Sequence, residues 1–139
     1  MERGVEMEPV KVVIRYSNGS VNKGFAKDFF PNKDHFHLFL SDKPSSEAIG
    51  VLVKELKAVF FVRDLTGSPL YKERKEYVEG EKPSGRKVAV TFVDDEVLVG
   101  STLGYDSKRQ GFFIFPADPE SNNMRVFVVS SAVKKVRYL

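Results

Sequence analysis

The sequence predicts an all-β protein made of two tandem, five-stranded small barrels that are related by internal duplication and packed together. Three observations lead to this prediction. Two stretches of about 55 residues repeat one another, hydrophobic and polar residues alternate over short runs, and no segment has the period of a long amphipathic helix. Units of this size are near the lower limit for independent folding, which favours two copies that share a buried surface.

The repeat can be followed residue by residue. Residues 11–16 match residues 87–92 at a spacing of 76, and Gly24 meets Gly100 at the same spacing. A glycine inside a strand favours a sharp bend, which a small barrel needs in order to close. After a loop, the match resumes at a spacing of 74, where residues 58–65 correspond to residues 132–139.

Each copy is expected to contain five short strands. An N-terminal arm covers residues 1–9, the first barrel residues 10–65, a linker residues 66–86 and the second barrel residues 87–139. Asn18 and Gly19 predict a tight hairpin after the first strand, because both residues accept positive φ angles. A 3₁₀ turn is expected before each fifth strand. The charged middle of the linker, residues 71–79, has the composition of a brief helix.

Composition narrows the class of protein. The chain has no Cys, which excludes disulfide scaffolds and thiolate metal sites. No apolar run approaches the ~20 residues that span a bilayer, and the first residues lack the pattern of a signal peptide. We therefore expect a soluble, cytoplasmic protein without membrane contact. The net charge of +3 is too small to indicate a nucleic-acid partner by itself.

The hairpin, the bent second strand at Gly24 and the hydrophobic third strand resemble the first Sm motif, over about 30 residues of each copy. Five strands with a 3₁₀ turn are likewise similar to SH3-like barrels. The Arg-Gly pair of the second Sm motif is missing from both copies. The whole chain also resembles a family of uncharacterised bacterial proteins, on residues 56–64 and 111–119 with Asn122-Asn123. This resemblance implies a fold and a bacterial source but no activity.

Two matched loops carry a candidate nucleic-acid site, because Sm-like barrels use the loop between the second and third strands to bind RNA bases. Positive or polar residues occupy this loop in both copies, at Asn32, Lys33, Lys108 and Arg109. Aromatic residues beside them could stack on bases: Phe29, Phe30, Phe36 and Tyr105. An ordinary solvated loop, with some of these rings in the core, is the alternative.

A second candidate surface is aromatic. Phe60 and Phe61 are adjacent in a strand, so the side chain of one of them must point away from its own barrel core. At a spacing of 74, the corresponding residues of the second copy are Lys134 and Lys135. Phe113 and Phe115 make the third strand of the second copy apolar on both faces. These four residues predict either packing between the barrels or a surface for a partner chain.

Two groups of polar residues are candidate chemical sites. His35 and His37 lie on one strand face and could hold a metal with Asp28 or Asp34. Two histidines on a solvent-facing or half-buried strand are the favoured explanation, and no metal is expected. Residues 94–96 are acidic, but their position predicts a hairpin turn. No catalytic residues are identified, and no cofactor is expected.

The function expected from the sequence is a non-enzymatic bacterial binding or adaptor module that uses loops and strand edges. Its partner would be another protein or a second copy of the chain. The alternative is RNA or single-stranded nucleic-acid binding through the basic loops.

Overall fold

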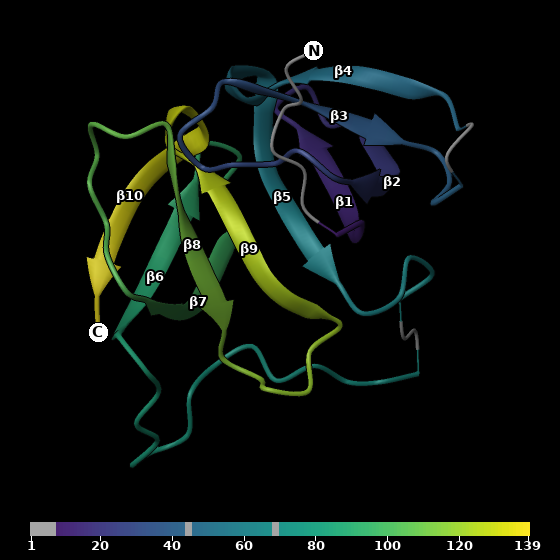
Figure 1. Ribbon diagram of the computed structural model, residues 1–139. Coiled ribbons are helices and arrows are strands. Elements are labelled where there is room, and N and C mark those ends of the chain that lie inside the picture. The colour runs from purple at the N-terminus through teal and green to yellow at the C-terminus, as the bar shows by residue number, and fades with distance from the viewer. Residues whose placement is uncertain (1–7, 44–45, 68–69) are drawn as a thin grey trace.

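The computed structural model describes residues 8–43, 46–67 and 70–139, and it is all-β (Figure 1). Ten antiparallel strands form a single sheet in the order β10-β6-β7-β8-β9-β5-β1-β2-β3-β4. The strands are β1 (Val10–Tyr16), β2 (Val21–Ala26), β3 (His35–Phe39), β4 (Ala48–Leu52), β5 (Leu56–Val62), β6 (Arg86–Phe92), β7 (Val97–Thr102), β8 (Gly111–Pro116), β9 (Asn123–Val129) and β10 (Val133–Tyr138). Short 3₁₀ turns, η1 (Val53–Glu55) and η2 (Ser130–Ala132), precede β5 and β10. The predicted all-β class is confirmed.

The first five strands and the last five strands pair in the same order within the sheet. In the first half β5 pairs with β1, and β1 to β4 follow in sequence; in the second half β10 pairs with β6, and β6 to β9 follow. Gly24 and Gly100 occupy matched positions in β2 and β7. A Cβ on either glycine would lie 2.3 Å from a carbonyl oxygen of the next strand, so only glycine allows this close approach.

The spacing of 74 expected for the last strand is wrong. Val59 lies opposite Ile14 in β1, and Val136 lies opposite Val90 in β6, so the spacing is 77 (59 to 136). The hairpin of the third and fourth strands is one residue longer in the second half, because His35 pairs with Leu52 (52 − 35 = 17) and Gly111 pairs with Val129 (129 − 111 = 18). The similar Ala-Val-x-x-Val-Arg pattern of the two halves conceals this extra residue. The counterparts of Phe60 and Phe61 are therefore Arg137 and Tyr138, not Lys134 and Lys135.

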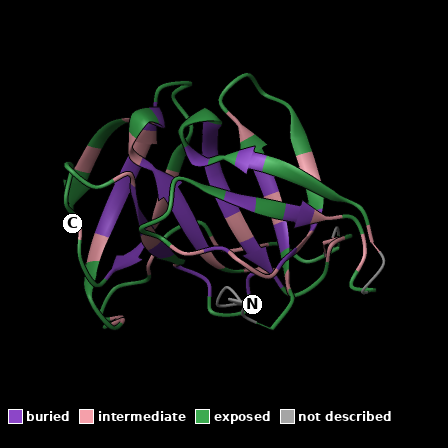
Figure 2. Ribbon diagram, turned by 45° about the horizontal axis from the view of Figure 1, so that its top comes forward, coloured by how far each residue is buried: buried purple, intermediate pink, exposed green. Residues whose placement is uncertain are grey.

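The two halves meet edge to edge through β5 and β9. Val59 lies opposite Phe127 in this antiparallel pair, and Phe60 lies opposite Val126. We expected two barrels packed through strand faces, whereas the backbone hydrogen bonds run continuously from one half to the other. Figure 2 shows that buried residues run along the strands while the loops are mostly exposed.

Each half supplies side chains to the core of the other. Phe127 and Val129 belong to the core of the first half, around Val12, Ile14 and Leu38. Ala58 in turn belongs to the core of the second half, and Phe60 packs against it. The joint between β5 and β9 is therefore part of both hydrophobic cores.

A buried charge also links the halves. Lys57 of β5 is 7% exposed, and its Nζ lies 2.7 Å from Asp94 Oδ2 and also contacts Glu96 in the β6–β7 turn. Burial alone would lower the pKa of Lys57, but the hydrogen bonds to Asp94 and Glu96 outweigh burial and raise it. The acidic residues 94–96 thus form a turn, as expected, and two of them hold a lysine of the other half.

The linker contains no helix in its described part, residues 70–85, contrary to the composition of residues 71–79. Its polar groups bind the second half and one another instead. The Tyr71 hydroxyl donates to Asp118 Oδ2 at 2.6 Å, the Arg74 N–H donates to the same oxygen at 2.9 Å, and Arg74 forms an ion pair with Glu81. These tertiary contacts replace the helical hydrogen bonds of the segment. Among the described residues, no helix has the length and apolar character needed to span a membrane.

Phe127→Ala is expected to destabilise the whole chain by about 3–5 kcal/mol, because it empties a fully buried site at the joint. Urea denaturation should show one transition for the variant as for the wild type, because each half completes the core of the other. The midpoint urea concentration of the variant should be lower than that of the wild type. Phe115→Ala is the matched control, since this ring is 37% exposed. Equal losses for both variants, or a separate transition for one half, would contradict the shared core.

Tyr71 is expected to ionise late in an alkaline titration. Its hydrogen bond to the Asp118 carboxylate raises the pKa of Tyr71 to about 12, from 10.0. The stabilisation from this bond is present below pH ~10 and is lost as the pH rises toward ~12, because the folded state holds the proton more tightly than the unfolded state. The difference in tyrosinate absorbance between the wild type and Tyr71→Phe should have a midpoint near 12. A midpoint near 10, or an unchanged midpoint in Asp118→Asn, would refute this contact.

Candidate functional site

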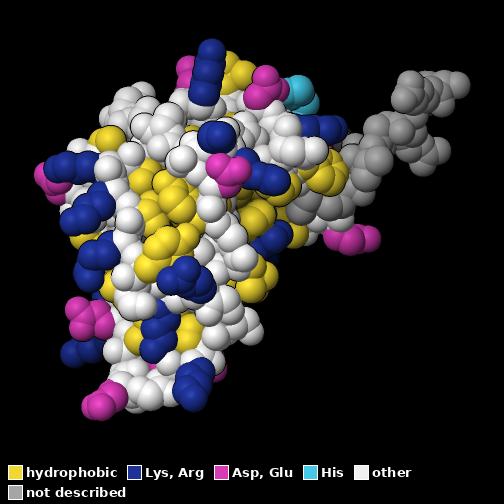
Figure 3. All heavy atoms as spheres, turned by 90° about the vertical axis from the view of Figure 1, so that its left-hand side faces the viewer, with side chains coloured by type: hydrophobic (Ala, Val, Ile, Leu, Met, Phe, Trp, Pro, Cys, Tyr) yellow, Lys and Arg dark blue, Asp and Glu magenta, His cyan; other side chains and the backbone are white. Residues whose placement is uncertain are grey.

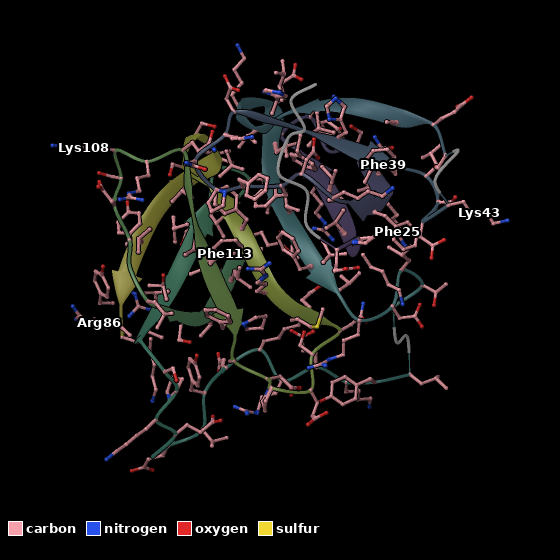
Figure 4. The ribbon with its side chains drawn as sticks, in the orientation of Figure 1. Phe25, Phe39, Lys43, Arg86, Lys108 and Phe113 are labelled. Carbon is pink, nitrogen blue, oxygen red and sulfur yellow. The ribbon has the colours of Figure 1, made fainter. Side chains whose placement is uncertain are left out.

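An open groove lies between the β7–β8 loop and the outer face of β8 and β9. Its volume is about 600 Å³, and it is lined mainly by apolar and aromatic side chains. The lining includes Leu103, Tyr105, Phe113, Phe115, Arg125 and Phe127. Figure 4 shows Phe113 on β8 near the middle of the molecule, and Lys108 pointing outward from the tip of the β7–β8 loop.

The groove exists because β7 and β8 separate. They pair only at Gly100 with Pro116 and at Ser101 with Phe115. The first four residues of β8, from Gly111 to Ile114, therefore pair with β9 on one side only. The buried Thr102 holds the departing loop in place: its hydroxyl donates to Phe113 O at 2.9 Å and accepts from Gly104 N–H at 3.3 Å. Part of the β8 edge is thus open to the groove.

Arg125 places a positive charge against the aromatic wall of the groove. Its guanidinium carbon lies 4.4 Å from the centre of the Phe61 ring and 4.6 Å from that of Phe113. Contacts of this kind hold a guanidinium flat against aromatic faces and leave its N–H donors free at the edge. Partial burial lowers the pKa of Arg125. Within the described ranges, no carboxylate lies within ion-pair distance of it.

An aromatic cluster connects the groove to the first half. Phe29, from the β2–β3 loop, meets Phe61, Phe113 and Phe127 edge to face, with ring centres 5.1 to 6.4 Å apart. Phe29 and Phe36 are both buried, so neither can stack on a base as we had suggested. Phe30 and Tyr105 are half-buried and stay accessible in part.

The two basic loops lie next to each other. The side-chain amide of Gln110 donates to the carbonyl of Pro31 at 2.7 Å and to that of Lys33 at 2.6 Å. The β2–β3 loop of the first half is thereby joined to the β7–β8 loop of the second. Asn32, Lys33, Lys108 and Arg109 are all exposed. In Figure 3, which views the molecule from the left-hand side of Figure 1, hydrophobic side chains gather in the middle, and Lys and Arg side chains lie around them together with several Asp and Glu side chains.

The four phenylalanines predicted as a shared or partner surface have different surroundings. Phe61 is buried in the core of the first half, and Phe60 is half-buried against the core of the second. Phe113 and Phe115 line the groove. The most exposed of the four is Phe115 on β8, and Phe60 on β5 and Phe113 on β8 are both half-buried.

His35 and His37 do not form a metal site with their neighbours. Their rings lie 6.3 Å apart on one face of β3, and each Nδ1 faces a separate carboxylate, Asp34 at 2.9 Å and Asp28 at 2.6 Å. Across residues 8–43, 46–67 and 70–139, no group of three potential ligands is close enough to hold a metal.

Sequence reasoning did not identify Arg125, because its neighbours in the sequence give no sign that it lies over rings from two other strands. Gln110 was also missed. The signal that could have drawn attention to the groove is the repeat itself: at a spacing of 76, Asp28 corresponds to Gly104 and His37 to Phe113, so the polar pair of the first copy is absent from the second.

Comparison with known proteins gives a family but no activity. A family model described as a family of unknown function (DUF6982) matches residues 8–139, which include both halves and the linker. No curated protein and no solved structure matches the chain. The expected likeness to an uncharacterised family is confirmed at this level.

Proposed function

The chain belongs to a family of unknown function (DUF6982), and we propose that it is a non-enzymatic binding module whose main binding surface is the groove beside β8. The observation that carries this proposal is the guanidinium of Arg125, which lies against the rings of Phe61 and Phe113 in an open, apolar groove and has no carboxylate partner among the described residues. Concave apolar surfaces with a few fixed polar groups are where proteins bind their ligands. The partner is a segment of another protein or of a second copy of this chain.

Our proposal includes the architecture. We describe each half as an SH3- or Sm-like barrel, and the pair as the product of a duplication in a bacterial, cytoplasmic protein. Three features support this description: both halves have the same strand order, both have a 3₁₀ turn before the last strand, and both have a glycine in the second strand. Small barrels of this kind bind partners through loops and open strand edges.

RNA or single-stranded nucleic-acid binding is the second candidate. The observation that favours it is the link through Gln110, which places two positively charged loops side by side. Asn32, Lys33, Lys108 and Arg109 would contact phosphates, and Phe30 and Tyr105 offer the nearest partly accessible rings. The local positive charge is modest, because Asp106 lies 4.0 Å from Arg109.

Blocking the groove should abolish partner capture. Phe115→Lys places a long charged side chain on the groove wall and is expected to lose a protein that the wild type retains in a pulldown with nuclease. Val93→Lys is the matched control, because Val93 is an exposed apolar residue outside the groove. If both variants retain the same partner as the wild type, the groove is not the binding surface.

Reversing the charge of the basic loops tests the second candidate. Replacing Lys33, Lys108 and Arg109 with Glu should abolish retention on a single-stranded RNA column at moderate salt. Any binding that remains at low salt should depend less steeply on salt concentration, by a slope that corresponds to about two to three lost phosphate contacts. The matched control replaces the exposed linker residues Lys72, Lys75 and Lys82 with Glu, which changes the net charge equally. Identical elution of both triple variants would refute a specific nucleic-acid site.

A further inference from the structure

A carboxylate closes the open strand edge in the first half. Asp28 Oδ1 accepts the backbone N–H of His37 at 2.9 Å, and Asp28 Oδ2 lies 2.6 Å from the Nδ1 of the same residue. His37 is in β3, at a point where β2 no longer pairs with it. Asp28 therefore satisfies a backbone donor that a neighbouring strand would otherwise bind.

The second half lacks this carboxylate. Gly104 stands at the position of Asp28, and Phe113 at that of His37. The carbonyl of Phe113 accepts the Thr102 hydroxyl on the β7 side of β8. Because the N–H and C=O of one strand residue point to the same side, the N–H of Phe113 also faces the groove. No side chain within the described ranges accepts a hydrogen bond from it, so the groove has an open donor where the first half has a bound carboxylate.

Arg125 adds a second donor group to the same groove. A guanidinium binds a carboxylate through two parallel hydrogen bonds, and this interaction is strong where water is partly excluded. The surrounding walls are apolar, with Leu103 and Phe115 exposed to an incoming group. The chemistry of the groove therefore fits an anion attached to an apolar side chain.

We propose that the groove binds an extended peptide segment by a carboxylate that takes, in the second half, the place that Asp28 fills in the first. The carboxylate accepts hydrogen bonds from the Phe113 N–H and from Arg125, and an adjacent apolar side chain of the ligand packs on Leu103 and Phe115. This inference rests on the proposed binding function and adds the class of ligand.

The lining favours a peptide over a nucleic acid. The charged residues of the groove are Arg109, Arg125 and Asp106, which leaves a single net positive charge for the ligand. On the open edge of β8, the backbone groups of Gly111 and the N–H of Phe113 point away from β9, while Thr102 already binds the Phe113 carbonyl. These groups can pair with another peptide backbone, and peptides commonly bind by extending a sheet in this way.

Two small probes test the chemistry directly. Acetyl-leucyl-phenylalanine, with a free carboxylate, and its amide are each titrated into the full chain, and backbone and arginine side-chain N–H signals are followed by NMR. The expected result is a saturable shift of the Phe113 N–H and the Arg125 Nε–H with the carboxylate and a response at least about tenfold weaker with the amide. Equal responses, or shifts confined to other residues, would overturn the proposal.

Gly104→Asp should close the groove from within. A Cβ at Gly104 meets nothing within 4 Å, so an aspartate can start from this position without a clash, and we expect its carboxylate to bind the Phe113 N–H as Asp28 binds that of His37. This variant is expected to lose the carboxylate response, while Gly104→Ala, which adds a Cβ but no carboxylate, keeps it. Arg125→Gln should weaken the response by about tenfold or more. Full binding by Gly104→Asp would overturn the proposal.

The results also separate this inference from the proposed function. A partner that Phe115→Lys loses but that Gly104→Asp still binds would leave the binding module standing and overturn the carboxylate site. A response to the dipeptide, without any captured partner, would support the site and refute the module. If an oligouridylate shifts the NMR signals of the groove residues and the dipeptide does not, the result would favour nucleic-acid binding and overturn the proposed peptide ligand.

Discussion

The arrangement of the whole molecule depends on the pairing of β5 with β9. This joint converts two five-stranded units into one sheet and places Phe127 of the second half in the core of the first. It also brings Phe61 under Arg125, because the two residues lie opposite each other in the pair. A groove between β8 and its neighbouring loop would exist without the joint, but its charged group would lose the ring that orients it.

The joint also explains why two strands in matching positions of the two halves differ in sequence. Ala58 and Phe60 of β5 lie in the interior of the sheet, where the strand has partners on both sides. Their counterparts in β10, Lys135 and Arg137, lie on the outer edge of the sheet and are exposed. Charged side chains on an edge strand discourage pairing with other chains. The matching positions are therefore apolar in β5, which pairs with a strand on each side, and cationic in β10, which pairs with β6 alone.

The sequence predicted what local patterns control: the all-β class, most strand positions, the hairpin at Asn18 and Gly19 and the special role of Gly24 and Gly100. It failed where contacts between distant residues decide. The register of β10 is set by backbone pairing with β6, and a chance similarity in sequence pointed to a shift of three residues. The helix expected in the linker does not form in its described part, where Tyr71 and Arg74 donate hydrogen bonds to Asp118 instead. Arg125 gains its significance only from rings that lie far away in the chain, whereas the exchange of Asp28 for Gly104 was already visible in the repeat.

The central position of β5 also matters while the ribosome is making the chain. β5 ends at Val62 and its partner β9 begins at Asn123, so about 60 residues must be added before the joint can form. At a synthesis rate of roughly 5–20 residues per second, the apolar edge of β5 stays without its partner for about 3 to 12 seconds. During this interval the first half also lacks Phe127 and Val129 from its core. The nascent first half is thus the stage at which this protein is most exposed to aggregation and has most need of a chaperone.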